Sequence, residues 1–258
     1  MSFDVNVAWL VAVLLMSIRM GILFYATPFD TMGRLPAQLR VYLGLMMAVV
    51  LVNALSITPA YLPSSIVELG LMGLREVMLG LVMAFGFYCA MASIMVAGKL
   101  IDFQAGFGAA QILNPATNAN SPLMGTVLSL LTVMIFFLSD AYLLAFKGIA
   151  YSLQIVPPGA GLAHFVLTDI VKQFSVVYVY GVIIAAPVIG VLMLLDTGIA
   201  VMGRTMPQMN VYFLFLPLKI GVALILTAAS LRYLSPVLER LFLTVFEYWQ
   251  RLLMSGAT

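Results

Sequence analysis

Stretches of about twenty apolar residues recur along this chain, and they limit what it can fold into. A helix needs roughly twenty apolar residues to cross the hydrocarbon core of a bilayer. Six stretches meet this requirement. They are residues 6–26, 41–57, 77–97, 123–146, 173–195 and 211–231. Because backbone polar groups in lipid must be satisfied within the segment, as they are in a helix, the sequence predicts an all-α polytopic membrane protein.

Composition agrees with this prediction and removes one class of partner. Of the 258 residues, 64% are hydrophobic and 9% are charged, whereas soluble domains carry about 25% charged residues. Twelve Lys and Arg against ten Asp and Glu give a formal net charge of +2, which leaves no basic face for a polyanion. We expect membrane lipid around the chain and no nucleic acid as a partner.

Several ionisable residues lie inside or near the apolar stretches. Arg19, Asp140 and Lys219 are in this position, and an ionised group at the bilayer centre costs at least about 2.5 kcal/mol on insertion scales. Opposite charges can pair across helices, and Asp140 or Asp196 are candidate partners for the two cations. The alternatives are a proton or ion relay, or contacts with other subunits. The fifth stretch also contains Pro187, which kinks a helix because it removes one backbone hydrogen bond.

Residues suited to chemistry are scarce. The sequence has one histidine, His164, in an expected loop, and one cysteine, Cys89, within an apolar run. No spacing of His, Cys or carboxylates indicates a metal site, and no serine or glycine motif indicates a nucleophile or a phosphate loop. The sequence therefore predicts no catalytic residue, no cofactor and no metal, and we expect a protein that is not an enzyme.

An amphipathic helix is predicted after Pro236, in "VLERLFLTVFEYWQRLL". Its apolar residues recur at helical spacing, and the charged residues lie mainly on the other side. Two interpretations remain open: the helix lies on the membrane surface, or it docks in the groove of a partner.

The segment 106–122, "GFGAAQILNPATNANSP", is uncharged and rich in residues that break helices. Its backbone cannot face lipid at membrane depth, because each unsatisfied N–H or C=O would cost several kcal/mol. Loops in water usually carry charge, yet this region has none from Phe103 to Ser139. We favour a segment tucked into a protein cavity as a gate or plug, with an ordinary surface loop as the alternative.

Three blocks in order along the chain resemble the FliR family, called SctT in virulence systems. They are "RLPAQLRVYLGLMMA", "GKLIDFQAGFGAAQILNPATNANSPL" and "GRTMPQMNVYFLFLPLKIGVAL". The resemblance covers nearly the whole chain. It implies a single-copy, non-enzymatic subunit of the type III secretion export gate, in the bacterial inner membrane at the flagellar basal body. It does not separate a flagellar from a virulence system.

The resemblance also implies partners and a domain organisation. FliP and FliQ would join the chain in a closed helical hetero-oligomer that forms the pore for unfolded flagellar proteins, with FlhB wrapped around it. Residues 1–172 would be the FliP-like part, including the plug at 106–122. Residues 173–258 would be a kinked FliQ-like hairpin that ends in the amphipathic helix.

The residues expected to serve these roles fall into two sets. The plug set is Gly106, Phe107, Gly108, Gln111, Ile112, Leu113, Asn114, Pro115, Asn118 and Pro122. The set expected at structural and subunit contacts is Arg34, Pro36, Arg40, Asp102, Gln104, Pro187, Arg204, Pro207, Gln208, Asn210, Pro217 and Lys219. A different hypothesis is a small secondary transporter, which would use Asp102, Asp140 or Asp196 as a coupling site and a helix broken at Pro187.

Overall fold

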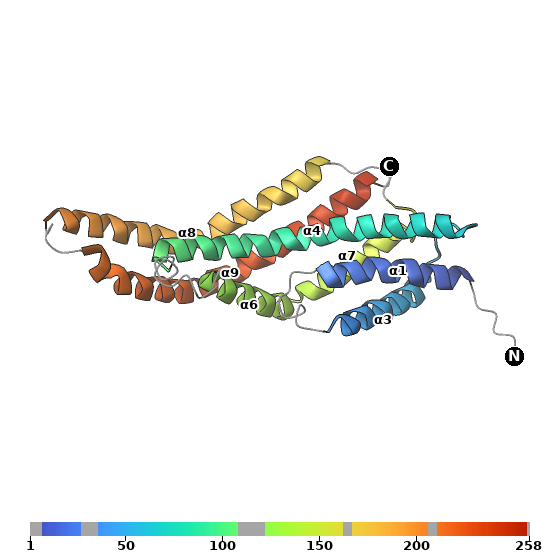
Figure 1. Ribbon diagram of the computed structural model, residues 1–258, viewed down its shortest axis with the longest axis horizontal. Coiled ribbons are helices and arrows are strands. Elements are labelled where there is room, and N and C mark those ends of the chain that lie inside the picture. Colours follow the sequence, from blue (N-terminus) through green and yellow to red (C-terminus); the bar gives the residue numbers. More distant parts are fainter. Residues whose placement is uncertain (1–6, 27–35, 108–121, 162–166, 206–210, 257–258) are drawn as a thin grey trace. The chain divides into compact units, whose positions relative to one another are not determined.

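The computed structural model describes residues 7–26, 36–107, 122–161, 167–205 and 211–256. Within these ranges the chain forms helices and no strand (Figure 1). The helices are α1 (Val7–Ala26), α3 (Ala37–Leu55), α4 (Ile66–Ala105), α6 (Leu123–Leu138), α7 (Ala141–Ile155), α8 (Leu167–Thr205) and α9 (Val211–Gly256). Among the described residues, five helices are long and apolar enough to cross a membrane, or up to six if α6 and α7 are counted as one broken span. The predicted all-α polytopic membrane fold is confirmed.

The chain divides into two compact units. Unit 1 comprises Met1–Cys89, Asp140–Gln173 and Phe242–Thr258, and unit 2 comprises Ala90–Ser139 and Phe174–Leu241. Helices α4, α8 and α9 each contribute to both units. With 40, 39 and 46 residues, these helices would each be about 60–70 Å long at 1.5 Å per residue. They therefore exceed the twenty-residue spans expected from hydropathy.

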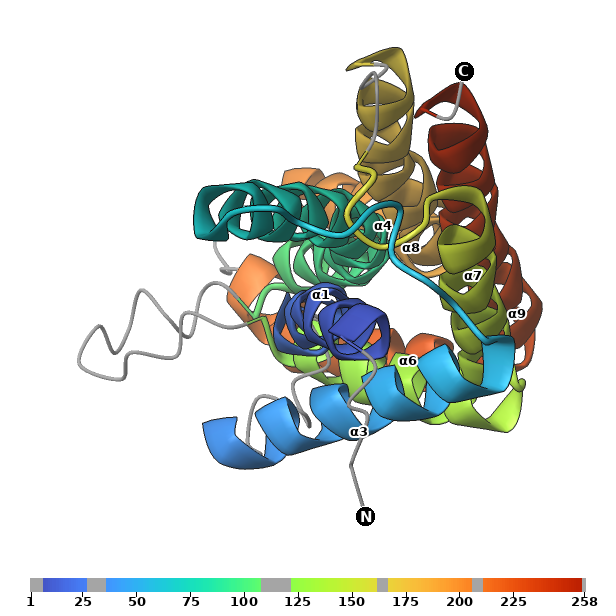
Figure 2. The ribbon, with the colours of Figure 1, turned by 90° about the vertical axis from the view of Figure 1, so that its right-hand side faces the viewer.

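In unit 1, α1 and α3 lie side by side (Figure 2) and run in opposite directions (Figure 1). Trp9 donates its indole N–H to Asn53 Oδ1 at 2.9 Å near one end of the pair. Towards the other end Gly44 faces Gly21, and a Cβ on Gly44 would lie 3.4 Å from the Gly21 Cα. Small residues at a helix contact let two backbones approach closely, as in other membrane helix pairs.

The C-terminal part of α9 belongs to the core of unit 1, contrary to both interpretations of the amphipathic tail. Phe242, Val245 and Leu252 are buried within the chain itself. Trp249 donates its indole N–H to the Met83 carbonyl at 2.9 Å. A Cβ at Gly148 would lie 2.6 Å from the Trp249 ring, so this glycine makes room for the indole. The apolar stripe predicted to meet lipid or a partner is covered by the chain's own helices.

Two further details differ from the predicted spans. The stretch 123–146 is divided at Ser139 and Asp140, because Asp140 adopts a left-handed conformation with φ 55° that ends one helix and starts the next. Aspartate is one of the few residues that tolerates this conformation. In contrast, α8 runs through Pro187 and α9 through both Pro217 and Pro236. Helix α8 is therefore continuous at Pro187, where the transporter hypothesis expects a broken helix.

Candidate functional site

The candidate site is the base of the segment 106–122, in unit 2. Gly106, Phe107 and Pro122 are described at its two ends. The remaining predicted plug residues lie outside the described residues. They are Gly108, Gln111, Ile112, Leu113, Asn114, Pro115 and Asn118. The structure therefore describes the contacts at the two ends of the segment.

The first end is closed by a helix C-cap. Gly106 has φ 88°, a conformation that glycine adopts without steric cost. The Gly106 N–H donates to the Phe103 carbonyl at 3.3 Å, and the Phe107 N–H donates to the Asp102 carbonyl at 3.0 Å. This pair of bonds is a Schellman motif, which satisfies carbonyls in the last turn of α4. The chain therefore leaves α4 at a defined point and angle.

The second end is capped by a residue from the first. Pro122 occupies the N-cap position of α6 and forms no side-chain cap hydrogen bond. The buried carboxylate of Asp102 provides the cap instead. It accepts from the Met124 N–H at 3.1 Å through Oδ1 and 3.2 Å through Oδ2. A negative charge at a helix N-terminus is favoured by both the free N–H groups and the helix dipole. Asp102 thus joins the last turn of α4 to the first turn of α6.

Backbone contact strengthens this junction. A Cβ on Gly98 would lie 2.1 Å from the Gly125 Cα and 2.2 Å from its nitrogen, so α4 and α6 touch where neither residue has a side chain. One turn further, the Ser129 hydroxyl lies 3.3 Å from the Met95 sulfur. The contacts of Gly98 with Gly125 and Asp102 with Met124 define the clamp, a name we keep for these four residues.

A second polar cluster joins α4 to α8 and α9 in the same unit. Lys219 Nζ lies 2.7 Å from Asp196 Oδ1, and the Gln104 amide donates to Asp196 Oδ2 at 2.7 Å. The Lys219 side chain is 7% exposed and that of Asp196 is 37% exposed. The candidate pairing of Lys219 with Asp196 is confirmed, and Gln104, two residues before Gly106, is part of it.

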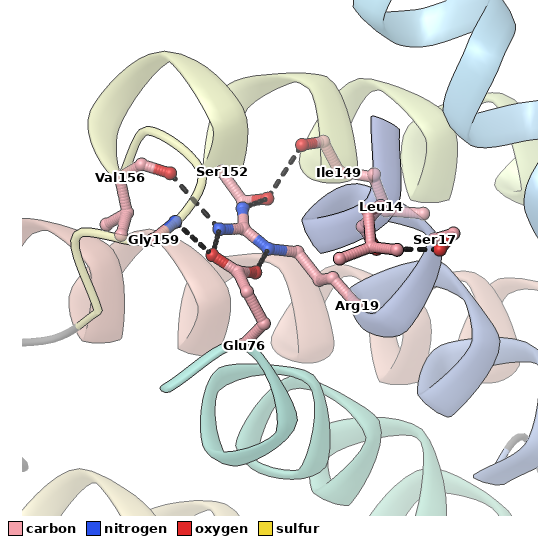
Figure 3. Close-up of polar contacts among 8 residues, drawn as sticks. All are labelled: Leu14, Ser17, Arg19, Glu76, Ile149, Ser152, Val156 and Gly159. Atoms are coloured by element: carbon pink, nitrogen blue, oxygen red, sulfur yellow. Dashed lines mark hydrogen bonds and ion pairs between the residues drawn. The ribbon is translucent and has the colours of Figure 1, made fainter. Parts of the chain in front are cut away.

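Unit 1 contains a buried ion pair between α1 and α4 (Figure 3). Arg19 Nε donates to Glu76 Oε2 at 2.6 Å, and a second guanidinium nitrogen donates to Oε1 at 3.0 Å. The Ser152 hydroxyl at 3.1 Å and the Val156 carbonyl at 3.2 Å each accept a further guanidinium N–H. The Gly159 N–H donates to Glu76 Oε1 at 2.8 Å. Both charges are fully buried, and the network satisfies them with bidentate geometry.

The partner of Arg19 differs from the one predicted from the sequence. Asp140 and Asp196 are the predicted candidates, but Glu76 binds it, so this prediction is wrong. Sequence spacing does not reveal which helices face one another. The position of Glu76 beside an apolar run nevertheless marks it as a candidate partner for a buried cation. The clamp glycines, Gly98 and Gly125, are also not among the residues predicted from the sequence. The available signal is that α4 and α6 are both apolar helices that contain glycine, a residue that allows two membrane helices to pack closely.

The remaining predicted residues are dispersed. Pro36 is the N-cap of α3, and Arg40 lies half-buried in its first turn. Arg204 is exposed in the last turn of α8, while Pro187 and Pro217 are exposed within α8 and α9. Arg34, Pro207, Gln208 and Asn210 lie outside the described residues, as does His164.

The polar contacts described above join neighbouring helices within each unit. Within the ranges that the structure covers, no three His, Cys, Asp or Glu side chains gather where they could hold a metal ion. The polar groups of the clamp, the Lys219 cluster and the Arg19 pair form bonds with one another inside each unit. The fold and site together define the class: an all-α polytopic membrane protein whose paired polar residues join its helices.

Comparison with known proteins gives the family. The chain matches the bacterial export proteins, family 1, over residues 10–245, and it belongs to this family. It is 29% identical over 246 residues to flagellar biosynthetic protein FliR of Bacillus subtilis, covering 94% of each chain. It is 29% identical over 241 residues to FliR of Caulobacter vibrioides, covering 92% of each. It is also 26% identical over 155 residues to Yop proteins translocation protein T of Yersinia pestis, covering 59% of each.

Proposed function

We propose that this protein is a non-enzymatic core subunit of a type III secretion export gate. Together with FliP-like and FliQ-like subunits, it forms the pore through which unfolded flagellar proteins leave the cytoplasm. The observation that carries the proposal is the family match over residues 10–245, together with the coverage of nearly the whole length of the FliR relatives. Their names specify flagellar biosynthesis, and this supports a position at the flagellar basal body in the bacterial inner membrane.

The surface of each unit supports a role inside a larger membrane assembly. In unit 2, large apolar side chains such as Val182 and Leu194 on α8 are 56% and 74% exposed. In unit 1, Ile66 and Val67 at the start of α4 are 85% and 69% exposed. Apolar surface of this extent needs lipid or protein against it. We assign part of this surface to the FliP-like, FliQ-like and FlhB-like partners.

Within this function, we assign the segment 106–122 to a plug that closes the pore at rest. The clamp supports the assignment, because it joins the two helix turns that flank the segment and so holds its two ends close together. We also propose that the chain has two parts: residues 1–172 are the FliP-like part, and residues 173–258 are the FliQ-like hairpin. The twelve residues expected at structural and subunit contacts keep that proposed role.

The transporter alternative receives less support. It requires a discontinuous helix at Pro187, but α8 is continuous from Leu167 to Thr205. It also requires an available coupling carboxylate. Of its three candidates, Asp196 is paired with Lys219 and Asp102 caps α6, while Asp140 is exposed at the start of α7.

Co-expression tests the proposed function. The chain is produced with and without FliP-like and FliQ-like partners, extracted in mild detergent, and its mass is measured. We expect a monodisperse hetero-oligomer with the partners and an unstable or aggregated chain without them. A well-folded, monodisperse monomer would contradict the export-gate assignment, and solute transport by the chain alone would favour the transporter.

A further inference from the structure

Helix α4 presents a narrow apolar stripe on the surface of unit 1. Its members are spaced alternately four and three residues apart, which is the a/d pattern of a coiled-coil heptad. They are Val67, Leu71, Leu74, Met78, Leu81, Phe85 and Tyr88. Phe85 is half-buried and the other six are exposed. We call these seven residues the seam.

The sides of α4 that face away from the seam belong to the core of unit 1. Met72 and Leu79 are fully buried. The Met83 carbonyl accepts the indole N–H of Trp249 from α9. The chain therefore covers α4 opposite the seam and leaves the seam itself exposed over three heptads.

The narrowness of the seam favours a helix over lipid as the group that covers it. A strict a/d stripe is typical of a coiled coil, whereas other amphipathic helices carry an apolar band at least about 100° wide. Helix α8 in unit 2 has the wide kind of face, because the adjacent pairs Tyr178 with Val179 and Val182 with Ile183 are exposed. Lipid imposes no heptad spacing, but pairing with another helix does.

An apolar groove beside the seam offers room for side chains of such a helix. Its volume is about 460 Å³. Val77 and Leu81 of α4 line one side, and Val41 and Leu45 of α3 are among the residues that line the rest. Because Leu81 belongs to the seam, the groove opens directly beside it. Paired helices insert side chains of one into holes on the other.

Arg75 places a positive charge on the flank of the seam. It follows Leu74 directly, which is an e position of the heptad, and it is exposed. One guanidinium nitrogen donates to the Tyr61 hydroxyl at 3.2 Å and to the Gly159 carbonyl at 3.4 Å. Both acceptors are neutral, and Arg75 forms no ion pair within the part of the chain that the structure describes. Charged e positions select the partner in coiled coils, so a carboxylate complements this flank.

We propose that the seam binds one long helix of a partner subunit, with an apolar a/d repeat of its own and an acidic residue beside Arg75. The inference rests on the proposed function, because the partner is another subunit of the same export gate. The 21-residue advance from Val67 to Tyr88 gives the seam a length of about 32 Å. A partner helix of three heptads matches this length.

Photocrosslinking tests the seam in the complex assembled with its partners. p-Benzoylphenylalanine replaces Leu71, Leu74, Met78 or Leu81, one at a time. The control position is Met254, an exposed residue of α9 in the same unit. We expect the four seam positions to capture one partner segment, at residues that advance in steps of three and four, and Met254 not to capture it. If one substitution blocks assembly, the other three carry the same expectation.

Charge reversal tests the flank. Arg75→Glu should lower the yield of the complex about twofold to fivefold, the effect of one exposed ion pair. Arg75→Lys keeps the cation and should stay near the unmodified yield. Changing the captured segment's carboxylate to lysine should restore the yield of Arg75→Glu. Loss of the bonds to Tyr61 and Gly159 alone would not be restored in this way.

Three results from an assembled complex would overturn the proposal. Lipid adducts alone at all four positions would show that the seam faces the bilayer. Captured partner residues without a helical repeat would exclude a paired helix, and equal yields for Arg75→Glu and the unmodified chain would remove the acidic residue. Failure to assemble with any FliP-like or FliQ-like subunit is a different result, which would contradict the proposed function and this inference with it.

Discussion

The carboxylate of Asp102, in the last turn of α4, receives the backbone N–H of Met124 in the first turn of α6 at 3.1 and 3.2 Å. The two residues flank the segment 106–122 and hold its ends together. Capping of one helix by the end of another couples the geometry of the two, because neither turn can shift without losing the bond. The base of the proposed plug is therefore a structured element.

Replacing Asp102 tests this coupling. Asp102→Ala removes the cap of α6, and loss of an N-cap side chain costs about 0.5–2 kcal/mol. We expect a lower thermal midpoint for the assembled complex. Asp102→Asn keeps one acceptor oxygen and should retain most of the stability. Equal thermal midpoints for Asp102→Ala and the unmodified protein would show that the cap contributes nothing to the stability of the complex.

The glycine contact makes a sharper prediction. Gly98→Ala places a methyl group 2.1 Å from the Gly125 Cα, so α4 and α6 must separate. We expect a severe loss of folded protein, measured as the yield of monodisperse complex. The matched control is Gly198→Ala on α8, where nothing lies within 4 Å of the added Cβ. That variant should be neutral or gain about 0.5–1 kcal/mol from the helix preference of alanine. Similar yields for the two variants would contradict the clamp.

The buried pair of unit 1 is expected to behave differently from a surface ion pair. Arg19→Met leaves the Glu76 carboxylate buried without its cation, and such a break costs about 3–5 kcal/mol. Arg19→Met combined with Glu76→Met removes both charges and should be less destabilised than the single change. Thermal unfolding of the two variants in the same detergent measures this difference. A double variant at least as unstable as Arg19→Met would mean that the network contributes more than charge pairing.

The ion pair of Lys219 with Asp196 leads to a prediction about assembly of the complex. Lys219→Leu leaves Asp196 with Gln104 as its remaining described partner, so the junction of α4, α8 and α9 loses its cation. We expect a lower yield of the complex with unchanged permeability of the complex that does form. Asp196→Asn is the complementary variant: it keeps the shape of the side chain but leaves the nearly buried Lys219 ammonium without its carboxylate, so it should also lower the yield. Normal yield with altered ion permeability would instead place Lys219 at the conducting lumen.

Hydropathy predicts which parts of the chain are helical, but it does not predict where the helices end. Glu68 and Glu76 lie before the predicted span 77–97, yet α4 includes both, because Ser64 and Ser65 bond Glu68 and Arg19 binds Glu76. Tertiary partners of this kind are invisible in a hydropathy window. The break at Asp140 depends on one left-handed residue, which apolar content does not report.

The candidate site shows the same limit. The composition of 106–122 singles out this segment, and Asp102 and Gln104 are among the residues expected at structural contacts. The bond from Met124 to Asp102 and the contact of Gly98 with Gly125 depend on the register between α4 and α6. The register depends on how the side chains of two whole helix faces fit together, and this fit cannot be read from the apolar pattern of the sequence.

The last prediction concerns the segment itself. Deleting Ala109 to Asn120 removes its central part and leaves Gly106, Phe107 and Pro122 in place. The clamp joins the flanking turns directly, so a short connection should be enough to link them. We therefore expect the shortened chain to assemble with its partners. If the segment plugs a pore, the membrane that contains this complex should leak ions or small solutes at rest.

Membrane conductance of the assembled deletion variant is the deciding measurement. Segments that must move aside for a passing chain belong to the least stable parts of a structure, and the deleted residues carry few large apolar anchors beyond Ile112 and Leu113. Asp102→Ala is the informative companion, because it loosens the base of the segment and keeps its sequence. It should leak less than the deletion and more than the unmodified complex. A tight membrane in an assembled deletion variant would refute the plug and favour an ordinary surface loop.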